Sequence, residues 1–175
     1  MEFASDAMLR GWMRHETRVL VAADGLAVDT ALVDVAVSAR AKRRAGACRY
    51  TPLPDARVGD PIARGERPDA TVELARRAAD AFDEATLRDV LRHELVHVEQ
   101  VQAYGVTDHG AAFRERADEL DVPLSCPTFT DPAYVLRCTA CEGVVGYRYR
   151  RCPTVETPER YRSDCCGAAL AVESE

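Results

Sequence analysis

The chain has 175 residues, 47% hydrophobic and 30% charged, which excludes a disordered or fibrous protein and leaves room for one domain plus a small module. It contains no apolar run near the roughly 20 residues that cross a bilayer, and its start lacks a signal-peptide pattern, so we predict a cytoplasmic protein without a membrane partner. The formal charge of -6 argues against nucleic-acid binding through the whole surface but is compatible with a local basic patch.

One helix and three short strands are predicted in the first 75 residues. Apolar residues recur at helical spacing from Ser5, a suitable N-cap, to about Ala23. Residues 31–39 alternate and carry β-branched side chains, which predicts a strand. Residues 40–50 and 71–74 are candidates for two more strands. The segment between them, 51–69, contains prolines and glycines and is predicted to be an exposed connection.

The segment from Asp83 to about Tyr104 gives the strongest helix prediction. Its apolar residues cover most of the helical circumference, so we expect a central, buried helix. They are Leu87, Val90, Leu91, Leu95, Val98 and Val101. A further helix is predicted over 111–120, and the prolines that follow indicate a hinge before the cysteine-containing remainder.

Residues 92–97, Arg-His-Glu-Leu-Val-His, place an H-E-x-x-H motif inside this central helix. His93 and His97 lie one turn apart on one face, close enough to ligate one zinc ion. Glu94 can accept a proton from zinc-bound water, which then attacks a peptide carbonyl. A glutamate between two histidines on a buried helix would be costly without such a metal. The motif therefore predicts a zinc metalloprotease with Glu94 as its catalytic residue.

A catalytic zinc needs a third protein ligand and keeps a fourth position open. His109 is the leading candidate, because it follows His97 by 12 residues at a loop-to-helix junction that can fold back over the site. Glu115 and Glu119 form the competing arrangement, a downstream carboxylate ligand.

Five of the seven cysteines lie between 138 and 166, where large apolar residues are few. The odd number of cysteines, without a secretion signal, argues against a disulfide framework. Cys138-Thr-Ala-Cys141 is a C-x-x-C knuckle, and Cys165-Cys166-Gly follows it. This layout predicts a zinc-ribbon-like module that holds a second, structural zinc through four thiolates.

The second knuckle is irregular, because Ser163 stands where a regular knuckle has a cysteine. Neighbouring side chains of an extended chain point apart, so Cys165 beside Cys166 is an awkward pair of ligands. Cys152 is the alternative fourth ligand. Cys48 and Cys126 are predicted to be core thiols.

Two basic segments, 40–50 and 137–151, are candidate DNA contacts, because arginines beside tyrosines can bind phosphates and stack on exposed bases. A solvated basic face is the alternative. The predicted DNA-binding residues are Arg40, Lys42, Arg43, Arg44, Arg148 and Arg150. Lys42 is the only lysine of the chain.

The sequence from His93 to His97, then His109-Gly-x-x-Phe113, then a cysteine ribbon, resembles the SprT-like metalloproteases, the family that includes Spartan. The basic segment that ends at Tyr50 is similar to that family's strand leading to its active-site edge. The resemblance implies that His93, His97 and His109 ligate zinc and that Glu94 is the acid and base. It also implies cleavage of proteins crosslinked to DNA, in a mixed α/β fold.

We therefore expect an α+β protein in two parts. A small mixed β-sheet packed on helices, including the central H-E-x-x-H helix, forms a metalloprotease domain over 1–125, and a zinc-ribbon-like β module follows over 126–175. The expected function is DNA-dependent proteolysis of DNA-bound or DNA-crosslinked proteins, with protein substrate and DNA as partners. The alternatives are a zinc peptidase that cleaves a regulatory protein without DNA, and a non-enzymatic zinc module that binds DNA or a partner.

Overall fold

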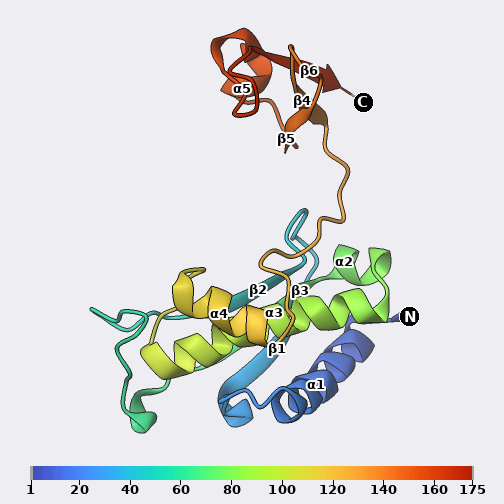
Figure 1. Cartoon of the computed structure of the whole chain (residues 1–175). Helices are drawn as coiled ribbons and strands as arrows, with labels where there is room; N and C mark the ends of the chain where they lie inside the picture. Colours follow the sequence, from blue (N-terminus) through green and yellow to red (C-terminus); the bar gives the residue numbers. More distant parts are fainter. Residues whose placement is uncertain (1, 175) are drawn as a thin grey trace. The chain divides into compact units, whose positions relative to one another are not determined.

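The chain forms two units, and the first consists of a small mixed sheet with helices packed on it (Figure 1). The computed structural model describes residues 2–174, and the chain divides into Met1–Phe129 and Thr130–Glu175. The elements of the first unit are α1 (Asp6–Ala23), β1 (Val33–Ser38), β2 (Gly46–Tyr50), β3 (Ala70–Ala75), α2 (Arg76–Ala81), α3 (Glu84–Tyr104) and α4 (Ala111–Glu119), with 3-10 turns at Thr30–Leu32 and Arg64–Glu66. Within the described residues, no helix is both long enough and apolar enough to cross a membrane.

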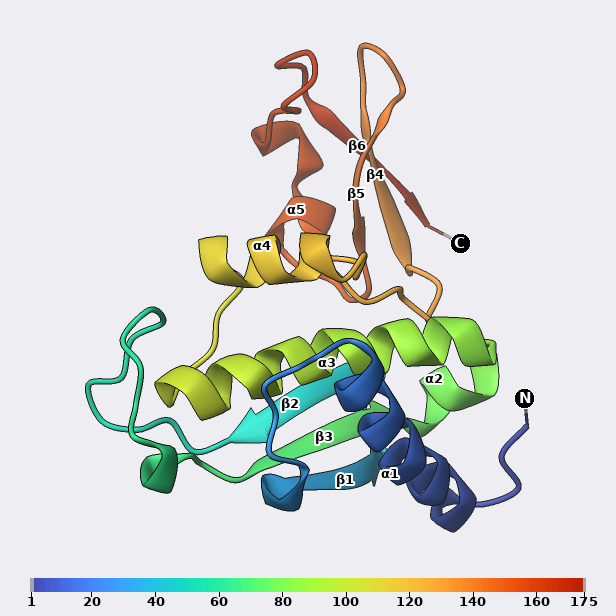
Figure 2. The same ribbon diagram turned by 60° about the horizontal axis from the view of Figure 1, so that its bottom comes forward.

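The sheet has the order β1-β3-β2, with β1 parallel and β2 antiparallel to β3. In β3, Ala70, Val72 and Leu74 are buried, while the residues between them are only partly covered, as expected for a sheet with one face on the core. Helix α3 packs on β2 and β3, and α1 packs on β1 and α3 (Figure 2). The core therefore lies between this sheet face and the two long helices.

Both long helices begin at residues that cap them. The Ser5 hydroxyl accepts from the Met8 N–H, which confirms the predicted start of α1. The Asp83 carboxylate accepts from the Thr86 N–H at the start of α3, and the helix ends at Gly105, whose φ of 74° is left-handed. The six apolar residues predicted to bury α3 are all inaccessible to solvent or nearly so.

The predicted elements differ from the observed ones in three places. The strand expected over 31–39 begins at Val33, because a 3-10 turn precedes it. The candidate strand over 40–50 is confined to β2, and 39–45 form a loop. Helix α2 was not predicted, because its six residues are too few to show helical periodicity. The α+β class itself is confirmed.

The second unit is a three-stranded antiparallel sheet of order β5-β4-β6 with a short helical segment. Its elements are β4 (Tyr134–Cys138), β5 (Val144–Arg148), α5 (Pro153–Glu156), a 3-10 turn at Pro158–Arg160 and β6 (Leu170–Ser174). Among its described residues, Leu136, Cys138 and Leu170 are the buried apolar ones. So small a core needs a covalent or metal crosslink to be stable.

Candidate metal centre

Three histidine nitrogens converge in the first unit. His93 and His97 lie on the same face of α3, and His109 lies in the loop before α4. The His109 Nε2 atom is 3.2 Å from the His97 Nε2 and 3.3 Å from the His93 Nε2. In a tetrahedral zinc site with Zn–N bonds of about 2.0–2.1 Å, the ligand atoms are about 3.3 Å apart. Both distances are therefore those expected between two ligands of one zinc ion, and the ligand atoms of all three histidines lie within 4.8 Å of one another.

The Nδ1 atoms of His93 and His97 each have a hydrogen-bond partner. His93 Nδ1 is 2.9 Å from the Pro123 carbonyl oxygen, which can only accept, so this nitrogen carries the proton. His97 Nδ1 is 2.7 Å from the Thr107 hydroxyl. Burial is the main factor that lowers the pKa of His93, and it lowers that of His97 to about 3. Both rings are thus neutral. His93 presents an Nε2 lone pair, as His97 does when its proton is on Nδ1, to a common point that a cation could occupy.

Phe113, from the first turn of α4, packs against all three histidine rings. Its ring centroid lies 5.0 Å from that of His93, 4.4 Å from that of His97 and 4.7 Å from that of His109. The side chain is fully buried. Phe113 therefore fixes the ring orientations and excludes water from one side of the centre.

Glu94 lies beside the histidines with little exposed surface. Its carboxylate accepts a hydrogen bond from the backbone N–H of Cys48 in β2, and its Oε1 is 3.8 Å from Cys126 Sγ. Burial raises the pKa of Glu94 to about 7, and the hydrogen bonds oppose this rise. A carboxylate with a pKa near neutrality is suited to exchange protons as a general base and acid.

Gly46 allows β2 to approach this carboxylate. A Cβ atom at position 46 would lie 2.6 Å from Glu94 Oε1, 2.8 Å from its Cγ and 2.9 Å from Val90 Cγ1. These separations are well inside van der Waals contact. The absent side chain is therefore what lets the strand and α3 meet at the Glu94 carboxylate.

The loop that carries His109 is held to α3 by a buried glutamine. With its amide oriented so that each donor faces an acceptor, Gln100 donates to the Thr107 hydroxyl at 2.5 Å and to the Asp108 carbonyl at 3.0 Å. Its oxygen accepts from the Phe113 N–H at 3.2 Å. The Thr107 N–H also donates to the Tyr50 hydroxyl at 3.2 Å.

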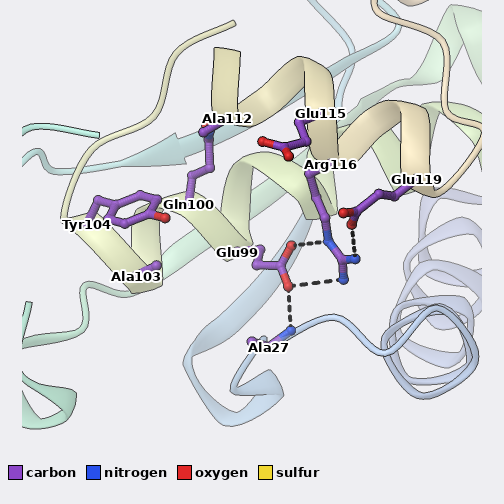
Figure 3. A pocket seen from close by; sticks show the side chains of 9 residues that line it. All are labelled: Ala27, Glu99, Gln100, Ala103, Tyr104, Ala112, Glu115, Arg116 and Glu119. Atoms are coloured by element: carbon purple, nitrogen blue, oxygen red, sulfur yellow. Dashed lines mark hydrogen bonds and ion pairs between the residues drawn. The ribbon is translucent and has the colours of Figure 1, made fainter. Parts of the chain in front are cut away.

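The alternative carboxylate ligands lie elsewhere. Glu115 and Glu119 line a hollow of about 370 Å³ between α3 and α4 (Figure 3), and Glu119 pairs with Arg116 at 2.9 Å. Arg116 also pairs with Glu99, whose other contact is the Ala27 N–H. Neither alternative is grouped with the histidines among the described residues, whereas His109 is.

The second unit brings four cysteine sulfurs together. Cys138, Cys141, Cys165 and Cys166 offer ligand atoms within 4.8 Å of one another, and the Sγ atoms of Cys141 and Cys165 are 3.6 Å apart. Four thiolates around zinc, with Zn–S bonds of about 2.3 Å, are about 3.8 Å apart. Cys165 and Cys166 do not point apart as an extended chain would require, because they lie in a turn that ends at Gly167, with φ of 63°.

Ser163 has a distinct contact at this cluster. Its buried hydroxyl donates to Cys138 Sγ at 3.2 Å, and this bond is the largest of the contacts that lower the pKa of the Cys138 thiol to about 6. Cys152, the alternative ligand, is not in the cluster formed by the described residues. Its sulfur contacts the Thr154 hydroxyl at 3.2 Å.

The predicted DNA-contact residues fall in both units. In the first, the loop 39–45 and Arg49 border a surface hollow of about 450 Å³. Its basic lining residues are Arg40, Lys42, Arg43, Arg44 and Arg49. Arg44 and Arg49 both pair with Glu73, at 3.3 Å and 2.9 Å. In the second unit, Arg148 bonds the Thr154 hydroxyl and the Tyr147 carbonyl, and Arg150 is exposed.

Several residues of the centre were not identified from the sequence. Gln100 gave a signal, because it is a polar residue on the buried face of α3 one turn beyond His97. Thr107, Pro123 and Gly46 gave none, because their roles depend on contacts between segments that are distant in the sequence.

Comparison with known protein families gives a match that lies almost entirely within the first unit. The model of the SprT-like family matches residues 16–131, which is about two thirds of the chain and includes all three histidines and Glu94. No curated protein and no solved structure matches the chain.

Proposed function

The chain belongs to the SprT-like family, and we propose that it is a zinc-dependent endopeptidase that acts on DNA-bound or DNA-crosslinked proteins. The observation that carries the peptidase assignment is the convergence of three histidine Nε2 atoms beside a buried glutamate. A purely structural zinc site has no use for a carboxylate in that position.

The residues present fit zinc. Three imidazoles whose ligand nitrogens converge leave one position of a tetrahedral zinc open, which is the donor set of a catalytic zinc site. In this assignment His93, His97 and His109 hold the metal. When bound, zinc lowers the pKa of a coordinated water and polarises a carbonyl oxygen.

Glu94 moves the protons of the proposed reaction. Its carboxylate takes a proton from the attacking water and returns it to the amine that leaves when the peptide bond breaks. The hydrogen bond from the Cys48 N–H and the contact with Cys126 hold the carboxylate within 4.8 Å of a His93 ring nitrogen. Burial of Glu94 keeps bulk water from competing for its proton.

The edge strand β2 is where we place the substrate chain. Within the described residues, β2 pairs with β3 on one side, and on its other side the Cys48 N–H bonds to Glu94 and the Gly46 N–H bonds to Cys126. An extended peptide can add to the remaining backbone groups of this edge by hydrogen bonds, which would require little of its side chains. This arrangement suits a protease that cleaves varied proteins.

The basic loop 39–45 supports a role for DNA. It immediately precedes Gly46, which abuts Glu94, and the positive charge of Arg44 is one of the factors that lower the pKa of Glu94. A phosphate backbone bound at this loop would therefore lie next to the catalytic carboxylate. The pairing of Arg44 and Arg49 with Glu73 offsets part of the charge and favours the alternative, a peptidase that works without DNA.

We also propose that Cys138, Cys141, Cys165 and Cys166 hold a structural zinc, so that the second unit is a zinc ribbon. Among the described residues of this unit, three apolar ones are buried, so apolar packing contributes little to its stability. The lowered pKa of Cys138 favours the thiolate form that zinc requires.

The test is cleavage of a protein crosslinked to DNA, compared with the same protein free of DNA, by the wild type and by Glu94→Gln. Zinc content is measured in each preparation. We expect the wild type to cut only the DNA-linked protein and the mutant to keep its zinc without cutting. Equal cutting of both substrates would remove the role of DNA, and a zinc-loaded wild type that cuts neither would refute the peptidase proposal.

A charge-reversal pair tests the basic loop. Arg40→Glu with Arg43→Glu is compared with Arg14→Glu and Arg18→Glu on α1, which change the net charge equally. Only the loop pair should weaken DNA-stimulated cleavage and reduce its dependence on salt.

A further inference from the structure

We propose that Gln100 and Thr107 are positioning residues that hold two of the three histidines of the metal centre in ligating geometry. This inference rests on the proposed zinc at His93, His97 and His109. Neither Gln100 nor Thr107 reaches the common point of the Nε2 atoms, so neither is a ligand or a catalytic residue.

Thr107 orients His97 directly. Its hydroxyl oxygen is 2.7 Å from His97 Nδ1. When Nε2 binds the proposed zinc, Nδ1 carries the ring proton, and the Thr107 oxygen accepts it. The same oxygen accepts from the Gln100 amide at 2.5 Å. Two donors thus fix the threonine oxygen, and this oxygen fixes the plane and tautomer of the imidazole.

Gln100 positions His109 through the backbone of its loop. Its amide nitrogen donates to the Asp108 carbonyl, one residue before His109, and its oxygen accepts from the Phe113 N–H, four residues after it. The loop is therefore fastened to α3 on both sides of the ligand. His109 is exposed, and its loop is also held to β2 by the Thr107 N–H, which donates to the Tyr50 hydroxyl at 3.2 Å. Gln100 is the side chain that ties the backbone on both sides of His109 to α3.

One buried side chain consequently connects the two ligands that come from different elements. Gln100 lies on α3, three residues beyond His97, and only 5% of its surface is exposed. Part of it borders the hollow between α3 and α4 (Figure 3). An alanine at this position would leave the Asp108 carbonyl and the Phe113 N–H without the partners they have in the wild type.

The same helix supplies a matched control. Gln102 is also buried, and it also clamps a loop, accepting from the Asp29 N–H at 2.7 Å and donating to the Asp29 carbonyl at 3.1 Å. That loop carries none of the three histidines. Gln102→Ala therefore removes a buried glutamine clamp of the same kind without touching the metal centre.

The experiment measures zinc affinity of the full chain by competition with a chromophoric chelator, and the histidine-bound zinc is identified as the one missing from His97→Ala. We expect Gln100→Ala and Thr107→Val to bind it about 10–100-fold more weakly than the wild type, the range for residues that orient metal ligands. Thr107→Ser, which keeps the hydroxyl, and Gln102→Ala should bind as the wild type does. The double variant Gln100→Ala/Thr107→Val should lose less than the product of the two single effects, because both residues act on His97 through one oxygen.

The outcomes separate this inference from the proposed function. If the wild type holds no more zinc than His97→Ala, there is no histidine-bound zinc to position, and both proposals are wrong. If His97→Ala loses a zinc that Gln100→Ala and Thr107→Val retain with wild-type affinity, the positioning role alone is refuted. Should Gln100→Ala not fold, the comparison of Thr107→Val with Thr107→Ser gives the same decision.

Discussion

The contact between Gly46 and Glu94 predicts that a methyl group at position 46 will displace Glu94 or β2 and impair the proposed catalytic site. In Gly46→Ala the added Cβ would meet Glu94 Oε1 at 2.6 Å, Glu94 Cγ at 2.8 Å and Val90 Cγ1 at 2.9 Å. The φ angle of Gly46 is not among the positive values, so alanine can adopt this backbone, and the effect is one of space alone.

The size of the effect follows from which atoms can move. The carboxylate is the flexible end of its side chain and can rotate, but the Glu94 Cγ and Val90 Cγ1 atoms belong to a packed helix face. Either β2 withdraws from α3 or Glu94 leaves its position. Overpacking of this kind costs about 1–3 kcal/mol. Loss of a positioned general base reduces the rate by about 10²–10⁴-fold.

Three measurements on Gly46→Ala test this reasoning: zinc content, thermal unfolding followed by the helical circular dichroism signal, and peptide cleavage. We expect bound zinc to be retained, because no histidine is touched, with a lower unfolding midpoint and at least about 100-fold slower cleavage. The control is Gly11→Ala in α1, where nothing lies within 4 Å of the added Cβ, and there we expect a small stabilisation. A Gly46→Ala protein with wild-type stability and cleavage would show that the strand and helix do not meet as described.

Three further predictions concern the scaffold. Arg88→Gln leaves the buried Glu16 without its partner and should cost about 1–3 kcal/mol at neutral pH. The hydrogen bond from Arg88 lowers the folded-state pKa of Glu16. This stabilisation is therefore present above the ordinary glutamate pKa and is lost as the pH falls through the lowered value. Urea unfolding curves of the wild type and of Arg88→Gln should thus converge in acid. Phe113→Ala should lower the unfolding free energy by about 3–5 kcal/mol, measured by urea titration, and a loss below 1 kcal/mol would contradict its full burial. Cys138→Ser should release one zinc and abolish amide-exchange protection in β4 while the helical signal persists; retained protection would show that the second unit folds without the metal.

The elements that the sequence predicted well are those whose signal is local. The Ser5 cap, the apolar circumference of α3 and the H-E-x-x-H spacing are each contained in one segment, and each is confirmed as a structural feature. Helix α2 lacked such a signal because it is too short to show a period. The sheet order, with β3 between β1 and β2, depends on pairing between distant segments and could not be predicted from alternation.

The same distinction applies to the metal centre. His93 and His97 were predicted to be adjacent because helical geometry alone places them so, whereas the approach of His109 depends on Gln100 and on the packing of Phe113. The difficulty expected for adjacent cysteines arose from assuming an extended chain. The left-handed Gly167 permits a turn instead, in which Cys165 and Cys166 both join the cluster.

The loop 39–45 also carries Lys42, which is exposed and is the only lysine in the chain. An amine-directed reagent therefore has one side-chain target, which lies in the loop that leads into Gly46. A fluorophore or photocrosslinker attached there would label each molecule at a single, known side chain. Protection of Lys42 from acetylation, read by mass spectrometry, would report occupancy of the loop without any substitution in the protein.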